Sequence, residues 1–150
     1  MGTSSGPRVG EVDPDGAWQI IAENSAARLI DVRTSAEWGS VGVPDLKEAG
    51  QQPLFVEWAQ LPDMSPNPRF AEEVMEALGD NPEGPLLFLC RSGVRSLGAA
   101  HAIAAELAER GVEADCLNVA EGFEGDAGPT GQRGTVNGWV FRGLAWRRPL

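Results

Sequence analysis

The segment 85–90, Pro-Leu-Leu-Phe-Leu-Cys, constrains the fold more than any other part of the chain, because it contains no polar side chain. An unbroken apolar run of this length is typical of a central parallel strand that is covered on both faces. Two arginines, two serines and a glycine follow within residues 91–96, and helical spacing of apolar residues continues from Val94 to Arg110. The sequence therefore predicts a buried strand, a tight polar loop and a long helix that ends at Gly111.

The rest of the chain alternates between short apolar segments and segments with helical spacing, which favours an open parallel sheet. We expect further strands at 28–33, 54–58 and 114–119, and further helices at 14–24, 35–38 and 70–78. The residues expected to be buried are Trp18, Ile21 and Ala22 in the first helix and Leu97, Ala100, Ile103, Ala104 and Leu107 in the long helix. The predicted fold class is α/β, a doubly wound open sheet of about five mostly parallel strands with helices on both faces.

A chain of 150 residues is long enough for one compact domain and too short for two ordinary ones. Residues 1–13 are rich in Gly, Ser and Pro and are expected to form an N-terminal tail before a single domain at 14–150. Within that domain, a Gly-rich loop at 124–136 precedes an aromatic and basic segment from Trp139 onward. We expect this segment, 124–150 in all, to pack back on the domain.

The composition excludes several classes of function. There are 12 basic and 22 acidic residues, a formal charge of −10, which argues against nucleic acid as the main partner. No apolar run is long enough to span a membrane, so no membrane partner is expected. Two cysteines without a secretory signal predict free thiols in the cytoplasm, and one histidine with two cysteines predicts neither a metal site nor a cofactor.

Cys90 is the candidate nucleophile, because it stands at the carboxyl end of the apolar strand, where open α/β sheets bind ligands. Gly93 permits a tight turn, and a loop that curls around the sulfur directs successive backbone N–H groups inward. The following helix adds partial positive charge at its N-terminus, and Arg91 and Arg95 add two full charges. Such surroundings favour the thiolate form of a cysteine, which is the nucleophilic form.

Three motifs resemble those of the single-domain rhodaneses, a family of sulfurtransferases. Leu29–Arg33 with Glu37-Trp38 resembles the family's first signature, Leu87–Ser96 resembles its active loop, and Val119–Phe123 resembles the signature after its last strand. The active loop is the most specific of these matches, and together they span residues 28 to 123.

The resemblance implies that the protein is a thiosulfate sulfurtransferase with a ping-pong mechanism. Cys90 would take the outer sulfur of thiosulfate as a persulfide and pass it to a thiol, to cyanide or to a protein acceptor. The loop residues Arg91, Ser92, Gly93, Val94 and Arg95 would bind the anion, with both guanidinium groups on the thiosulfate or the departing sulfite. Ser96, Asp31 and Arg33 would support the loop.

Departures from the family pattern lie around the rim of the expected pocket. Residues 39–45 lack the histidine that the family carries after its Glu-aromatic pair, and Glu121 replaces the first glycine of the last signature. A Gly-rich stretch also separates Phe123 from Trp139, where the family closes with a tryptophan soon after the signature. These differences bear on the choice of acceptor.

Alternatives to a free-standing enzyme are a persulfide carrier or a non-catalytic binding module for a protein partner. A cysteine phosphatase or arsenate reductase is disfavoured, because those enzymes carry arginine at the sixth position after cysteine, where this chain has Ser96. Cys116 is expected in the core, and His101 lies too far along its helix to act as a base for Cys90. Glu37 is expected to pair with Arg33.

Overall fold

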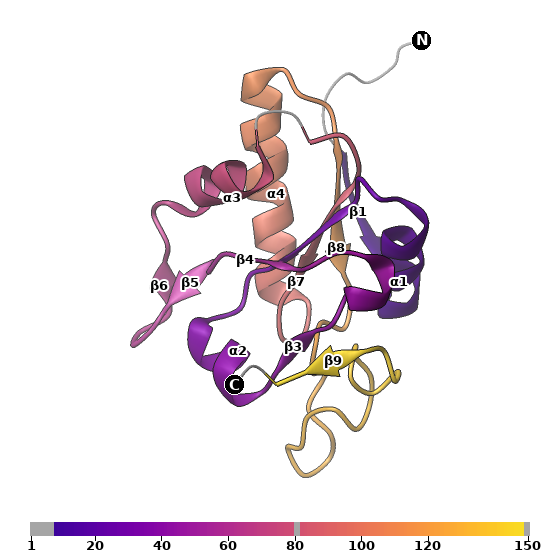
Figure 1. Ribbon diagram of the computed structural model, residues 1–150. Coiled ribbons are helices and arrows are strands. Elements are labelled where there is room, and N and C mark those ends of the chain that lie inside the picture. The colour runs from indigo at the N-terminus through magenta and orange to yellow at the C-terminus, as the bar shows by residue number, and fades with distance from the viewer. Residues whose placement is uncertain (1–7, 80–81, 149–150) are drawn as a thin grey trace.

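The computed structural model describes residues 8–79 and 82–148, which are built around a parallel sheet of five strands in the order β1-β8-β7-β2-β4 (Figure 1). The strands are β1 (Arg8–Val12), β2 (Arg28–Asp31), β4 (Leu54–Phe55), β7 (Leu86–Leu89) and β8 (Asp115–Val119). Every pair of neighbours in this sheet is parallel, so all five carboxyl ends lie at one edge. This architecture confirms the predicted fold class.

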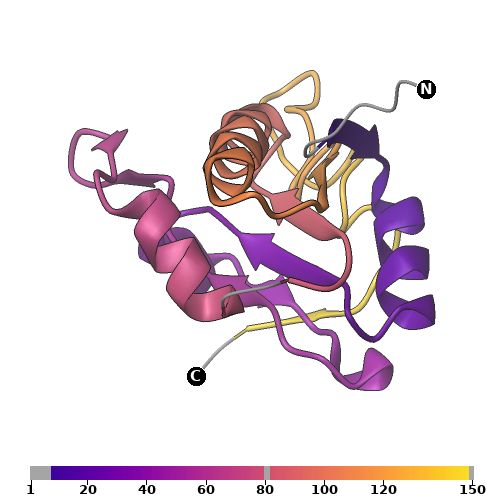
Figure 2. The same cartoon turned by 90° about the horizontal axis from the view of Figure 1, so that it is seen from above.

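Helices cover both faces of the sheet, as Figure 2 shows from above. They are α1 (Pro14–Glu23), α2 (Ser35–Ser40), α3 (Phe70–Leu78) and α4 (Val94–Arg110), with a short 3₁₀ turn, η1, at Lys47–Ala49. The side chains of β7 alternate between two cores. Leu86 and Phe88 face the core with α3 and α4, whereas Leu87 and Leu89 face the core with α1. This double burial explains why β7 lacks polar residues.

The expected tail at 1–13 is wrong for residues 8–12, which form β1 and pair with β8 from Arg8↔Asp115 to Val12↔Val119. The sequence Arg-Val-Gly-Glu-Val of this strand has neither an apolar run nor a regular alternation of apolar and polar residues. Its partner strand lies more than a hundred residues away in the sequence. Residues 1–7 lie outside the described residues. The helix that follows begins after Asp13, whose carboxylate accepts a hydrogen bond from Gly16 N at 2.7 Å.

The long helix has the predicted bounds, but two of the five residues expected in its buried stripe are not buried. Ser96, Ala99, Ala100, Ile103 and Leu107 face the sheet, whereas Leu97 is 41% exposed and Ala104 is only partly buried. The first buried residue of the helix is therefore Ser96, and a prediction based on the spacing of apolar residues does not include a serine. In α1, Ile21 is buried as expected, but Trp18 is half-buried and Ala22 is exposed.

Two short antiparallel pairs complete the structure. β5 (Ala59–Gln60) pairs with β6 (Ser65–Pro66), and β3 (Val43–Pro44) pairs with β9 (Trp146–Arg147). Trp139 is fully buried in the core beside α1, so the segment that follows the Gly-rich loop lies against the sheet domain. Among the described residues, no helix is both long and apolar enough to cross a membrane.

Candidate active site

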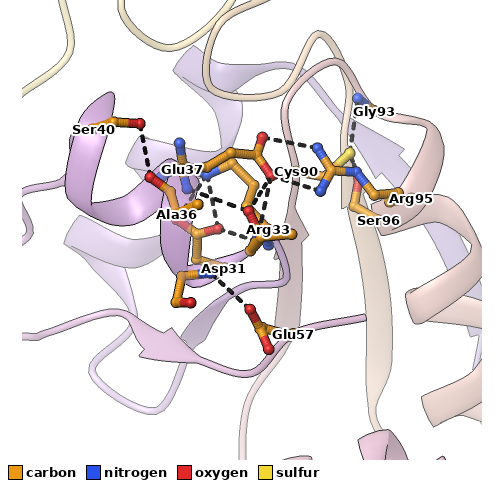
Figure 3. Close-up of polar contacts among 12 residues, drawn as sticks. Asp31, Arg33, Ala36, Glu37, Ser40, Glu57, Cys90, Gly93, Arg95 and Ser96 are labelled. Atoms are coloured by element: carbon orange, nitrogen blue, oxygen red, sulfur yellow. Dashed lines mark hydrogen bonds and ion pairs between the residues drawn. The ribbon is translucent and has the colours of Figure 1, made fainter. Parts of the chain in front are cut away.

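Cys90 lies directly after the central strand β7, at the edge where the carboxyl ends of the strands meet. The residue is 1% exposed. Gly93 N lies 3.1 Å from the Cys90 Sγ and Ser96 Oγ lies 3.2 Å from it, so the loop curls back on the sulfur (Figure 3). The cysteine is therefore held by hydrogen bonds rather than left among apolar neighbours alone.

The loop 91–93 turns at Gly93, which has φ +106° and is the N-cap of α4. Only glycine adopts this backbone conformation without steric cost, which explains its place between Cys90 and the helix. The amides of residues 91–95 were expected to face inward, and in the described structure Gly93 is the loop residue whose N–H donates to the sulfur. The N-terminus of α4 thus presents partial positive charge to Cys90.

The signature after β8 forms the support beneath this loop. Gly122 has φ +69°, and a Cβ there would lie 2.5 Å from the Arg91 carbonyl oxygen and 2.6 Å from that of Cys90. Phe123 N donates to Cys90 O at 2.8 Å, and Glu124 N donates to Arg91 O at 3.0 Å. The backbone of the active loop is therefore fixed by direct contact with residues 122–124, and only glycine fits at position 122.

Asn118, in β8, joins the site through Ser96 and was missed by the sequence analysis. Its Oδ1 lies 2.5 Å from Ser96 Oγ, and its Nδ2 lies 3.2 Å from Gly93 O and 3.1 Å from Glu11 Oε2. Glu11 is the Cα partner of Asn118 in the neighbouring strand β1. Asn118 could have been predicted as a site residue, because it is a polar residue near the carboxyl end of an apolar strand. No feature of the sequence around Glu11 indicates that it lies near the site.

Arg95 does not face the sulfur as a free cation, because Glu37 of α2 binds it with both carboxylate oxygens, at 2.8 and 2.9 Å. The two side chains are 19% and 20% exposed. Burial of Glu37 opposes its ionisation, but hydrogen bonds from Arg95 and Thr34 outweigh burial and lower the pKa of Glu37 to about 2. The hydrogen bonds to Glu37 raise the pKa of Arg95, against its burial. The expected pairing of Glu37 with Arg33 is wrong.

Arg91 and Val94 form the outer side of the loop. Arg91 is exposed, and within the described ranges no side chain hydrogen-bonds or pairs with its guanidinium group. Val94 is 77% exposed, whereas Ser92 is half-buried. Of the two arginines assigned to anion binding from the sequence, Arg91 is therefore the one whose charge is free for a ligand.

Asp31 and Arg33 are fully buried beside the loop rather than in it. Arg33 Nη2 donates to Asp31 Oδ2 and to Gly42 O, each at 2.7 Å, and the guanidinium carbon lies 4.3 Å above the centre of the Phe123 ring. Phe123 N in turn holds the Cys90 carbonyl. Arg33, which Asp31 holds in place, thus contacts Phe123, and Phe123 supports the loop.

Two other residues weighed in the sequence lie away from this chemistry. Cys116 is buried in the core of the α3 and α4 face, and burial raises the pKa of its thiol to about 12. The second cysteine is therefore a neutral, inert thiol at physiological pH. His101 is exposed on α4, and no described hydrogen bond joins it to the Cys90 loop.

Glu121, which stands where rhodaneses carry a glycine, anchors the C-terminal segment. It has φ +71°, a strained conformation for glutamate. Its carboxylate accepts hydrogen bonds from Arg142 Nη2 at 2.6 Å, from Arg142 Nε at 2.9 Å and from Gly138 N at 2.8 Å. The glutamate at this position therefore binds the extra segment between Phe123 and β9, through Gly138 and Arg142.

Comparison with known proteins places the chain among relatives of similar length. No protein-family model matches it. An uncharacterized homologue of RP600 from Rickettsia rickettsii is 34% identical over 131 residues, which cover 87% of this chain and 91% of that protein. RP600 itself, from Rickettsia prowazekii, is 30% identical over 131 residues. The crystal structure of Rv0390 from M. tuberculosis has 41% sequence identity and a TM-score of 0.80, and the match covers 95% of this chain and 99% of that chain.

The chain belongs to the same family as these proteins. Their names state no activity, so family membership by itself assigns none. Like Rv0390, this member has a rhodanese-like α/β fold, in which five parallel strands are flanked by helices.

Proposed function

We propose that the protein is a sulfurtransferase that carries sulfane sulfur as a persulfide on Cys90. One observation carries this proposal: the Cys90 sulfur sits at the start of α4, within hydrogen-bond distance of a loop amide and a serine hydroxyl. These donors and the helix N-terminus stabilise negative charge on sulfur, which both a thiolate and a persulfide anion carry. The resemblance of the loop to that of the rhodaneses supports the same chemistry.

The first half-reaction transfers one sulfur atom to the protein. The Cys90 thiolate attacks the outer sulfur of thiosulfate and forms a new S–S bond. The original S–S bond of thiosulfate breaks, and sulfite leaves with its electron pair. In the second half-reaction, a thiolate or cyanide attacks the outer sulfur of the persulfide and restores the Cys90 thiolate. No oxidant or reductant is needed in either step.

We assign the two loop arginines different parts in this reaction. Arg91 is exposed and without a partner among the described side chains, so it would hold the sulfonate group of thiosulfate and the departing sulfite. Both terminal nitrogens of the Arg95 guanidinium donate to the Glu37 carboxylate, so Arg95 would act by fixing the start of α4. This division replaces the sequence-based expectation that both guanidinium groups contact the anion.

A phosphatase-like reaction fits this site poorly. Such a reaction needs an arginine fork directed at the oxyanion held by the loop. Arg95 is the loop arginine nearest the required position in the sequence, and its fork is already occupied by a carboxylate. No second function is therefore proposed.

The intact mass of the purified protein tests the proposal. Thiosulfate should add one sulfur atom to the wild-type chain, cyanide should remove it as thiocyanate, and Cys90→Ser should gain none. Cys116→Ala is the matched control, because the proposal assigns no chemistry to Cys116, and it should load as the wild type does. A wild-type protein that gains no sulfur from thiosulfate or from other sulfane donors would overturn the proposed activity.

The same experiment separates an enzyme from a carrier. Steady thiocyanate production with thiosulfate and cyanide indicates a free-standing enzyme. A persulfide that forms but resists both cyanide and small thiols indicates a carrier, whose sulfur only a protein acceptor removes. A binding module would show neither reaction.

A further inference from the structure

The Ser96 hydroxyl has one hydrogen and two neighbours that could accept it. The Cys90 Sγ lies 3.2 Å from Ser96 Oγ, and the Asn118 Oδ1 lies 2.5 Å from it. All three residues are buried, so water does not readily replace a missing partner. The direction of this one hydroxyl hydrogen therefore affects whether Cys90 is held as a thiol or as a thiolate.

The orientation of the Asn118 amide decides the direction. Asn118 Nδ2 faces two acceptors, Gly93 O at 3.2 Å and Glu11 Oε2 at 3.1 Å. A reversed amide would set its oxygen against a carbonyl and a carboxylate, so the NH₂ group must stay on that side. The amide oxygen consequently faces Ser96, and because it can only accept, the Ser96 hydroxyl must donate to it.

We infer that Asn118, oriented by Glu11 and the Gly93 carbonyl, is a positioning residue that holds the Ser96 oxygen as an acceptor for the Cys90 thiol. The inference deepens the proposed function and rests on it for its role in sulfur transfer. In this state the Cys90 S–H donates to Ser96 Oγ, and the Ser96 O–H donates to Asn118 Oδ1. Each buried group then has a partner, so the resting thiol is stabilised.

Forming the thiolate requires this arrangement to switch. The Cys90 proton passes to water, the Ser96 hydroxyl turns from Asn118 Oδ1 to the sulfur, and the Asn118 oxygen loses its donor. The new O–H···S⁻ bond stabilises the thiolate, whereas the unpaired amide oxygen opposes it. Asn118 thus sets the cost of producing the nucleophile, separately from the charges around the loop.

Charged groups also lie on the elements around the Cys90 loop. They are Glu11 on β1, Asp31 and Arg33 around the end of β2, Glu37 on α2, Arg91 and Arg95 at the active loop, and Glu121 after β8. A substitution of Asn118 changes none of these charges. Its effect on the pH at which the thiolate forms therefore reports the hydrogen bond and not the electrostatic field.

The test is the pH dependence of iodoacetamide alkylation at Cys90, read by peptide mass spectrometry. Asn118→Leu, which nearly preserves side-chain volume, should shift the midpoint of this profile downward by about half to one pH unit. Asn118→Ala, which adds no atom to the buried site, should shift it in the same direction and guards against misfolding of the leucine variant. His101→Ala, on the exposed face of α4, is the matched control and should leave the midpoint unchanged.

A second pair of variants separates a route through Ser96 from a general loosening of the loop. In a Ser96→Ala background there is no hydroxyl to redirect, so Asn118→Leu should no longer shift the midpoint. An unchanged midpoint in both single Asn118 variants would overturn the inference. So would an upward shift, or a downward shift of equal size with and without the Ser96 hydroxyl.

Alkylation does not require sulfur transfer, so this result is independent of the test of the proposed function. If thiosulfate adds no sulfur to Cys90 while Asn118→Leu still shifts the profile through Ser96, the proposed activity fails and the hydrogen-bond switch stands. If the persulfide forms and the profile does not move, the switch fails and the activity stands.

Discussion

Glu37 and Arg95, which are 58 residues apart in the sequence, form a two-pronged ion pair with N–O distances of 2.8 and 2.9 Å. Glu37 also closes the N-terminus of its own helix, because its carboxylate accepts a hydrogen bond from Thr34 N at 3.1 Å. One carboxylate therefore connects α2 to the first turn of the helix that follows the Cys90 loop. This connection makes the shape of the candidate active site depend on an ion pair outside it.

Glu37→Gln should reduce stability in a pH-dependent way. The pKa of Glu37 falls in the folded protein from 4.5 to about 2, so the ionised side chain stabilises the fold above pH 4.5. The contribution, about 3 kcal/mol, is lost as the pH falls toward 2. Urea unfolding between pH 7 and pH 3 should show a steeper loss of stability for the wild type than for Glu37→Gln. Equal pH dependence of the two proteins would refute the prediction.

Arg91→Ala and Arg95→Ala should affect different properties. Removal of the exposed Arg91 should raise the KM for thiosulfate roughly 10- to 100-fold, as expected for one charged hydrogen bond, with little change in stability. Arg95→Ala leaves Glu37 partly buried and unpaired, which should cost roughly 2 kcal/mol of stability. Steady-state kinetics and urea unfolding of both variants measure the difference. The assignment fails if KM responds to Arg95→Ala and not to Arg91→Ala.

Gly122→Ala should disrupt the active loop, and Gly111→Ala is its matched control. Both glycines have φ +69°, so both substitutions carry a backbone cost of about 1–2 kcal/mol. A Cβ at position 111 meets nothing within 4 Å, whereas one at position 122 lies 2.5 Å from the Arg91 carbonyl. We therefore expect Gly122→Ala to lose a further 1–3 kcal/mol and most sulfur loading. Equal losses in the two variants would show that contact with the loop is unimportant.

Arg142→Ala should loosen the C-terminal segment. Arg142 binds the Glu121 carboxylate and also pairs with Asp15 at 2.7 Å, so it joins this segment to the signature after β8 and to α1. Limited proteolysis should cut residues 124–148 faster in this variant than in the wild type. Arg69→Ala, which removes an exposed arginine beside α3, is the control and should not change the cleavage rate there. Unchanged cleavage in Arg142→Ala would mean that burial of Trp139 alone holds the segment.

Much of the fold could be predicted because its signals are local. The apolar run of β7, the helical spacing up to Gly111 and the Gly93 turn depend on residues close together in the chain. β1 was missed because a strand at the edge of a sheet needs little apolar character, and its partner β8 is distant in the sequence. The buried face of α4 was predicted only in part, because it begins with Ser96, a polar residue whose hydroxyl lies within hydrogen-bond distance of the Cys90 sulfur.

The residue types of one short segment are enough to predict Cys90 as the nucleophile and residues 91–96 as its loop, and the alternation of apolar and helical segments along the chain predicts the class of sheet. The side chains that support this loop from other elements depend on how distant segments pack together. Parallel pairing of distant strands brings Glu11 of β1 and Asn118 of β8 together beside the loop, and Glu37 reaches Arg95 from α2. The loop arginines look equivalent in the sequence, but their surroundings differ, because a carboxylate from α2 reaches Arg95 and none in the described structure reaches Arg91.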